Sequence, residues 1–203
     1  MPDRVDALVF DLGRVVIDID FERAFARWAE HAGCDPQFIG KRFSPDAAFQ
    51  RHERGEIAGE AYFAGLCNSL GIDLTHAQML DGWNAIFVGE MPGMAELLAA
   101  AARRLPLYAL TNSNREHELY WSREFAGILR HFREIYVSST IGSRRPDAEV
   151  YRHVVGAIGV PAERIVFFDD KFENIEGARA CGLQAVLVTS IADVANALAR
   201  VLP

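Results

Sequence analysis

The chain has 203 residues, of which 50% are hydrophobic and 24% charged, which is typical of an ordinary globular protein. The net charge of -7 argues against a protein that coats nucleic acid, and no apolar run approaches the roughly 20 residues that span a bilayer. The first residues carry no signal-peptide pattern. We therefore expect a cytoplasmic protein, a monomer or a homodimer, that binds neither nucleic acid nor membrane.

A short apolar run at residues 7–10 ends at Asp11, and Gly13 follows at once. A continuous apolar run closed by a turn signal is typical of a buried parallel strand. The charge then lies at the carboxyl end of the strand, where open α/β sheets bind their ligands. A carboxylate there can be a nucleophile, a metal ligand or both, and the alternative is an Asp that only caps the next turn.

Residues 18–88 show apolar side chains at helical spacing and no run that is typical of a strand. The expected helices begin at capping or turn residues, and they cover residues 20–31, a segment from 35, a segment between 44 and 55, residues 59–70 and residues 75–87. Because strand motifs frame this segment, we expect it to be a helical insertion. Four of its aromatic residues could line a site, although their spacing places most of them in the insertion's own core: Phe21, Trp28, Phe49 and Trp83.

From Pro92 onward, strand-like runs alternate with helices. Strands are expected at residues 106–110, 135–138, 165–168 and 185–188, and helices at residues 93–104, 116–129, 148–158, 174–181 and 191–201. This alternation predicts an α/β fold with a doubly wound parallel sheet. The expected core comprises residues 1–17 and 89–203, and residues 18–88 form a small inserted helical cap domain.

Two of these strands also end in polar residues. The strand at 106–110 is followed by Thr111 and Asn112, and the strand at 165–168 by Asp169 and Asp170. If the strands are parallel neighbours, these groups converge with Asp11 on one crevice.

Four motifs, in this order, resemble those of the haloacid dehalogenase (HAD) superfamily. They are Phe-Asp-Leu-Gly (residues 10–13), Leu-Thr-Asn-Ser-Asn (110–114), Arg-Arg-Pro (144–146) and the acidic segment 167–178. Segment 49–57 is similar to the cap of the bacterial α-D-glucose-1-phosphate phosphatase type within that superfamily. The resemblance spans nearly the whole chain. It implies a Rossmann-like core under a cap and a Mg²⁺-dependent phosphatase for a small phosphorylated metabolite, such as the sugar phosphate glucose-1-phosphate.

Residue by residue, the resemblance makes Asp11 the nucleophile, which would form an aspartyl-phosphate. It implies that Mg²⁺ binds Asp11, Asp170 and the backbone carbonyl of Gly13, since this ion prefers hard oxygen ligands. Asp169 would support these ligands from behind, and Asn174 would bind a water on the metal.

The same resemblance assigns the transferring phosphoryl group to Thr111 and Asn112, through a hydroxyl and a backbone or amide N–H. Arg145 would add catalytic and substrate-binding positive charge. For Ser113 and Asn114 we favour a purely structural role in the loop.

Three positions depart from the pattern of the superfamily. Arg145 stands where a Lys is usual in the superfamily. The ammonium group of Lys171 could replace part of the charge of that missing Lys, although a solvated surface lysine is the simpler interpretation. Gly13 stands where many of these phosphatases carry an Asp that acts as general acid and base. A group from the cap could take that role, and the candidates are His52, Glu53 and Glu56. For each of them, however, we favour an exposed position at the end of a helix.

Two other functions remain open. A 2-haloacid dehalogenase uses the same nucleophile on carbon, but it needs no metal and typically carries small neutral residues where Asp169 and Asp170 stand. A non-catalytic protein of the same fold, which binds a phosphorylated ligand or a protein partner, would be consistent with Gly13 and Arg145.

Overall fold

The structure of the chain, a computed structural model, describes residues 4–202; the outermost residues of the expected core, 1–3 and 203, lie outside this range. Five parallel strands form one sheet in the order β5-β4-β1-β6-β7. Their bounds are Ala7–Phe10 (β1), Leu107–Thr111 (β4), Glu134–Val137 (β5), Ile165–Asp169 (β6) and Gln184–Leu187 (β7). The α/β fold with a doubly wound parallel sheet is confirmed.

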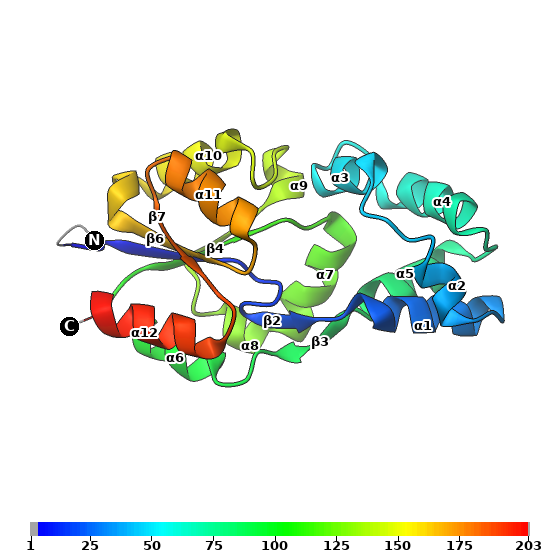
Figure 1. Cartoon of the computed structure of the whole chain (residues 1–203), viewed down its shortest axis with the longest axis horizontal. Helices are drawn as coiled ribbons and strands as arrows, with labels where there is room; N and C mark the ends of the chain where they lie inside the picture. Colours follow the sequence, from blue (N-terminus) through cyan, green and yellow to red (C-terminus); the bar gives the residue numbers. More distant parts are fainter. Residues whose placement is uncertain (1–3, 203) are drawn as a thin grey trace.

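Helices cover both faces of this sheet (Figure 1). One face carries α10 (Ala148–Ile158) and α11 (Phe172–Ala180), and the other carries α6 (Met94–Ala102) and α12 (Ile191–Val201). The remaining helices of this part are short or lie at its edge: α7 (Arg115–Glu124), α8 (Ala126–Leu129), α9 (Ser138–Ile141) and the 3₁₀ turn η1 (Ala162–Arg164). Ser138, which the sequence suggested as the end of a strand, begins α9 instead.

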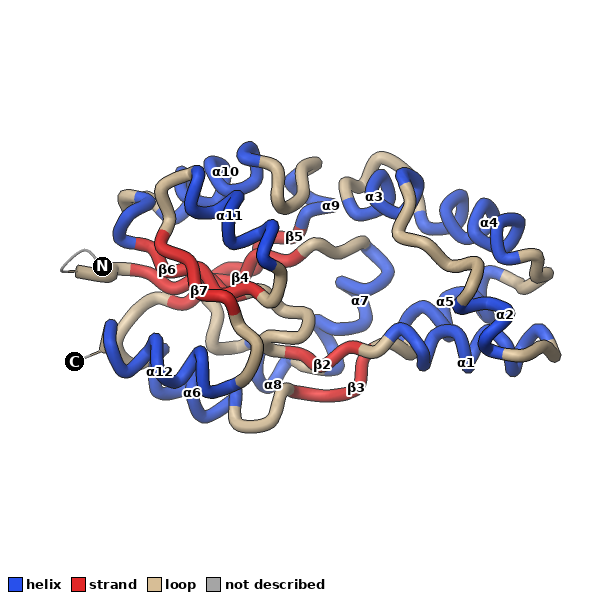
Figure 2. Tube along the Cα trace, viewed as in Figure 1, coloured by secondary structure: helices blue, strands red, loops and turns tan. Residues whose placement is uncertain are grey.

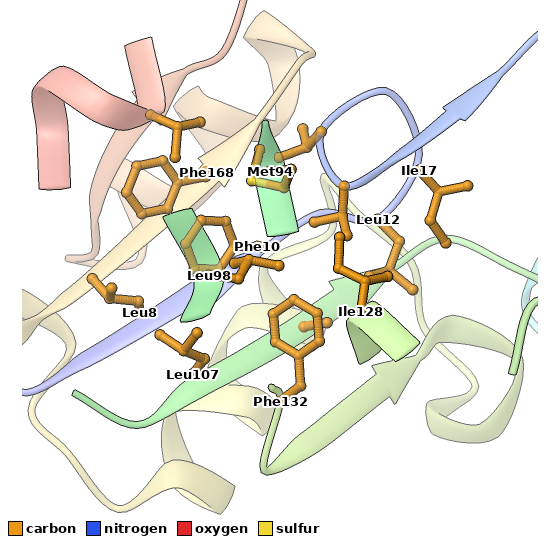
Figure 3. Close-up of a cluster of buried hydrophobic side chains, with 14 of the residues drawn as sticks. Leu8, Phe10, Leu12, Ile17, Met94, Leu98, Leu107, Ile128, Phe132 and Phe168 are labelled. Carbon is orange, nitrogen blue, oxygen red and sulfur yellow. The ribbon is translucent and has the colours of Figure 1, made fainter. Parts of the chain in front are cut away.

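Strand β1 is central because its side chains alternate between the two cores. Ala7 and Val9 pack with α10 and α11, while Leu8 and Phe10 pack with α6 and α12. Figure 3 shows Phe10 between two other rings, and its centroid lies 4.5 Å from the stacked ring of Phe168. Burial on both faces explains the uninterrupted apolar run that ends at Asp11.

Five helices form a second body beside the sheet (Figure 2), which we call the helical unit (residues 21–84). Its helices are α1 (Phe21–Ala32), α2 (Pro36–Gly40), α3 (Ala47–Glu53), α4 (Gly59–Leu70) and α5 (His76–Asn84). They share a core of their own, which is built around the fully buried rings of Trp28 and Trp83. Each of α1, α2 and α3 begins at an aspartate whose side chain accepts a backbone N–H: Asp20, Asp35 and Asp46.

The prediction that residues 18–88 contain no strand was wrong. Strands β2 (Ile17–Ile19) and β3 (Phe87–Glu90) pair antiparallel and connect the helical unit to the sheet. Helix α5 ends at Asn84, so Phe87 belongs to β3 and not to a helix. These strands are short, and their pairing joins residues about 70 positions apart, which hydrophobic periodicity does not reveal. In the described part of the chain, no helix has the length and apolar character needed to cross a membrane.

Candidate active site

The candidate site is a cavity of about 420 Å³ between the carboxyl ends of the strands and the helical unit. Its floor includes Asp11, Thr111, Arg145 and Asp170, so the polar ends of β1, β4 and β6 do converge as the sequence predicted. Its upper wall comes from the helical unit and from the strands that connect it: Ile19, Phe21, Phe43, Pro45, Phe49, Gln50, Glu53, Ile86 and Phe87. Two separate bodies therefore enclose one volume.

At the floor, a single guanidinium joins two buried carboxylates. Arg145 donates from Nη2 to Oδ1 of Asp11 at 2.8 Å, and from Nη1 to Oδ2 of Asp169. The backbone N–H of Leu12 also donates to Oδ1 of Asp11, at 2.7 Å. These two donors fix one carboxylate oxygen of Asp11 and leave Oδ2 without a hydrogen bond from the described residues. The arrangement holds Asp11 in one orientation at the end of β1.

Asp169 is fully buried, and hydrogen bonds occupy both of its oxygens. Besides Arg145, it accepts from the backbone N–H of Lys171 at 2.8 Å and from the side-chain amide of Asn174 at 3.0 Å to each oxygen. Asp169 therefore supports Arg145 from behind. The amide of Asn174, which we expected at a metal-bound water, donates to Asp169 in this structure.

The residues expected to hold a cation fit a hard divalent ion. Carboxylate oxygens of Asp11, Asp169 and Asp170 lie within 4.8 Å of one another. Burial raises the pKa of Asp11 to about 7 despite the adjacent Arg145, and burial and the neighbouring Asp169 raise the pKa of Asp170. A cation there would offset the cost of burying these charges. The carbonyl of Gly13 accepts no hydrogen bond from the residues that the structure describes, because Leu12 and Ile17 supply the carbonyls of that turn.

In the loop after β4, one side chain lines the cavity and the next is hydrogen-bonded to the backbone of a neighbouring loop. Thr111 is buried at the end of β4 and lines the cavity. Asn112 exchanges hydrogen bonds with the backbone of Arg145, 2.9 Å to its N–H and 3.0 Å to its carbonyl. This pair fixes the loop that carries Arg145, so the side chain of Asn112 has a scaffold role.

The next two residues of that loop also line the cavity, and hydrogen bonds tie them to the surrounding scaffold. Ser113 donates its backbone N–H to Ser138 at 2.9 Å, and its hydroxyl accepts from Trp121 at 3.3 Å. Asn114 caps α7 by accepting the backbone N–H of His117 at 3.0 Å.

Helix α3 is attached to the sheet body by polar contacts that the sequence did not reveal. His52 is 2% exposed and bonds through Nε2 to Glu116 on α7 at 2.8 Å. Glu53 is 7% exposed and accepts from Nε of Arg144 at 2.8 Å. The expectation of exposed positions was therefore wrong for His52 and Glu53. Glu56, in contrast, is exposed and pairs only with surface arginines.

Helix α5 is attached by aromatic stacking. The ring of His117 stacks on Trp83 with centroids 4.7 Å apart, and its Nε2 bonds to the Trp83 carbonyl at 2.9 Å. The indole N–H of Trp83 donates to Asn114 at 3.2 Å. Burial lowers the pKa of His117 to about 4, so the ring is neutral at pH 7. Trp83 and Trp28 are core residues of the helical unit, whereas Phe21 and Phe49 line the cavity.

Comparisons with known proteins found a matching family and similar proteins. The profile of the family described as haloacid dehalogenase-like hydrolase matches residues 5–182. The chain is 37% identical over 93 residues to an enolase-phosphatase E1 of Stenotrophomonas maltophilia, which covers 45% of this chain but only 40% of that protein. It is 22% identical to a D-ribitol-5-phosphate phosphatase of Bacteroides thetaiotaomicron over 87% of this chain and 88% of that protein.

Among solved structures, a HAD family enzyme of Bacteroides thetaiotaomicron in complex with magnesium and inorganic phosphate superposes with a TM-score of 0.78 at 23% identity. The match covers 90% of this chain and 93% of that chain. At this identity the likeness establishes a shared fold.

Proposed function

The chain belongs to the haloacid dehalogenase-like hydrolases, and from this premise we propose that it is a Mg²⁺-dependent phosphatase acting on a small phosphate monoester through an aspartyl-phosphate on Asp11. The observation that carries the proposal is the cluster on the cavity floor. Asp11 presents one free oxygen there, while Arg145 and Leu12 hold the other. Two further carboxylates lie within reach of one cation.

The fixed residues account for most of the expected chemistry. Oδ2 of Asp11 would attack phosphorus, and the oxygen bonded to Arg145 would keep the carboxylate aligned for that attack. The hydroxyl of Thr111 and the backbone N–H groups of its loop would hold the transferring phosphoryl group. The enclosing helical unit would exclude bulk water from the reacting centre.

A Mg²⁺ ion would bind Asp11, Asp170 and the carbonyl of Gly13, and it would supply positive charge beside the phosphoryl oxygens. Asp169 is already saturated with hydrogen bonds, so its proposed role is to hold Arg145. Lys171 is exposed at the rim of the cavity, where its charge would attract anionic substrates.

For the substrate, we propose a sugar phosphate such as glucose-1-phosphate. The resemblance of segment 49–57 to the corresponding cap supports this choice, as does the ribitol-phosphate activity named for one relative. The rings of Phe21, Phe43 and Phe49 offer apolar faces on which the C–H face of a sugar could stack.

The dehalogenase alternative is disfavoured by the floor of the cavity. The two carboxylates Asp169 and Asp170, with Asp11, concentrate negative charge where a metal-free enzyme would need neutral side chains. Chloride release from 2-chloropropionate in the presence of EDTA would revive this alternative.

The test is phosphate release from a panel of sugar phosphates, with Mg²⁺ and with EDTA. We expect Mg²⁺-dependent release that Asp11→Asn abolishes and that Asp73→Asn leaves unchanged. Asp73 is exposed in the loop between α4 and α5, so it controls for the loss of one surface charge. Failure of the wild type on every ester would overturn the phosphatase and favour a protein that binds phosphorylated ligands without turning them over.

A further inference from the structure

The leaving group of a phosphate ester needs a proton, and the usual position for the donor is Gly13, which has none to give. An ideal Cβ at this position would lie 3.1 Å from Cδ1 of Ile19, so an apolar side chain occupies the adjacent space. Building on the proposed phosphatase, we propose that Glu53 of the helical unit is the general acid for the leaving group and the general base for the attacking water. This assigns a catalytic residue to the upper wall of the cavity.

Lys171 also lines the cavity, but it is exposed at the rim, and the other titratable side chains of the lining are committed elsewhere. Asp11 and Asp170 belong to the nucleophile and cation cluster. His117 uses both ring nitrogens, with Nε2 on the Trp83 carbonyl and Nδ1 on the amide of Asn114 at 3.3 Å. Arginine guanidinium groups do not release a proton in proteins. Among the carboxyl groups that line this cavity in the described chain, Glu53 alone comes from the helical unit.

The position of Glu53 is fixed by two contacts from the sheet body. Nε of Arg144 donates to Oε2 at 2.8 Å, and the hydroxyl of Ser138 donates to the Glu53 backbone carbonyl at 2.6 Å. Oε1 accepts no hydrogen bond from the residues that the structure describes. One oxygen is thus anchored while the other remains available to carry and deliver a proton.

The surroundings of Glu53 suit a proton donor. Burial raises the pKa of its carboxyl, and the positive charges that face it, Arg144 first and then Lys171 and Arg145, oppose that rise. The net effect is a pKa above the ordinary value of a glutamate, which makes Glu53 a better proton donor than an exposed carboxyl group.

The two half-reactions balance. In the first, an oxygen of Asp11 forms a bond to phosphorus, the bond to the leaving oxygen breaks, and the proton on Oε1 of Glu53 passes to that oxygen to give the alcohol. In the second, the Glu53 carboxylate takes a proton from water as the water oxygen attacks phosphorus. The bond between phosphorus and Asp11 then breaks, which releases phosphate, the Asp11 carboxylate and a protonated Glu53.

The experiment compares phenyl phosphate with p-nitrophenyl phosphate in the wild type and in Glu53→Gln. The variant keeps an oxygen for Arg144 but has no acidic proton. Because p-nitrophenolate leaves readily as an anion, we expect Glu53→Gln to lower kcat/KM at least about 100-fold for phenyl phosphate and only a few-fold for p-nitrophenyl phosphate. Glu56→Gln, at an exposed position in the loop that follows α3, is the matched control and should behave as the wild type.

Equal losses on both esters would overturn the inference, since they would mean that Glu53 only positions the helical unit; no loss on either would overturn it as well. Release of no phosphate by the wild type would instead overturn the phosphatase on which the inference rests. If Glu53→Gln does not fold, kcat/KM of the wild type is measured instead on a series of substituted phenyl phosphates whose leaving groups differ in pKa. A weak dependence of kcat/KM on the leaving group's pKa supports protonation, and a steep one contradicts it.

Discussion

The floor and the upper wall of the cavity are built on different principles. The floor gathers charged groups from the ends of β1 and β6 and from the loop before α10, and hydrogen bonds hold Arg145, Asp169 and one oxygen of Asp11 there. The upper wall presents mainly apolar side chains, among them several phenylalanine rings, and Glu53 is its one carboxylate among the described lining residues. The floor rests on the buried sheet, and the wall belongs to a separate helical core.

This difference separates two tasks. Phosphorus chemistry needs charges that are held within fractions of an ångström, which the ends of a packed sheet provide. Recognition of the rest of the substrate needs shape and apolar area, which can change without disturbing the charged cluster. If the division holds, substitutions in the floor should destroy turnover and stability together, and substitutions of the apolar wall residues should act mainly on substrate binding, with Glu53 as the exception proposed above.

The largest effect is expected at Asp169, which supports the floor. Asp169→Ala should lower the free energy of unfolding by about 4 kcal/mol, because it leaves Arg145 and the amide of Asn174 buried without their shared acceptor. Asp169→Asn, which keeps one acceptor, should lose about half as much. Urea denaturation measures both values, and phosphate release should fall with them.

The exposed Asp73 provides the control for this series, since Asp73→Asn should leave the urea midpoint unchanged. A stable Asp169→Ala protein with full activity would contradict the idea that the floor depends on a saturated network.

Much of the floor could be predicted from the sequence because its signals are local. A buried parallel strand is a continuous apolar run; Asp11 directly follows one such run, and Asp169 and Asp170 follow another. The starts of α1 and α3 were visible for a similar reason, since Asp20 and Asp46 cap them within three residues.

The features that escaped prediction depend on contacts between distant segments. Glu53 pairs with Arg144 across 91 positions, and His52 with Glu116 across 64, so a pattern that looked like an exposed helix end is buried by the sheet body. The same holds for the pairing of β2 with β3. Local propensity carries no information about which partner will cover a polar side chain.

The contact between floor and wall at His117 should make the stability of the protein depend on pH. His117 has a pKa of about 4 in the folded protein, below the ordinary value of about 6.5 that applies when the chain is unfolded. On acidification, the unfolded chain therefore binds the proton at a higher pH than the folded protein does. The contribution of the neutral His117 ring to the free energy of unfolding is complete above pH 6.5 and is lost as the pH falls toward 4. The loss should amount to about 3 kcal/mol at most.

Thermal unfolding of the wild type and of His117→Asn between pH 7 and pH 4 measures this effect. Asn cannot titrate in this range, so the variant should be less stable at pH 7 but should lose less on acidification. Parallel curves for the two proteins would show that other groups cause the acid sensitivity, and the stack of His117 on Trp83 would then not be the pH-dependent part of the junction.

The smallest effect is expected in the wall itself, at Phe49, which lines the cavity and meets Trp83 edge-on at 5.9 Å. Phe49→Leu should raise KM for the preferred ester about five-fold, since the loss of one ring contact costs about 1 kcal/mol of binding. Inhibition by inorganic phosphate, which needs only the floor, should not change. Phe38→Leu, in the same helical unit but away from the cavity, is the control. Weaker phosphate inhibition in Phe49→Leu would show that wall and floor are coupled, because an apolar ring would then affect groups that it does not touch.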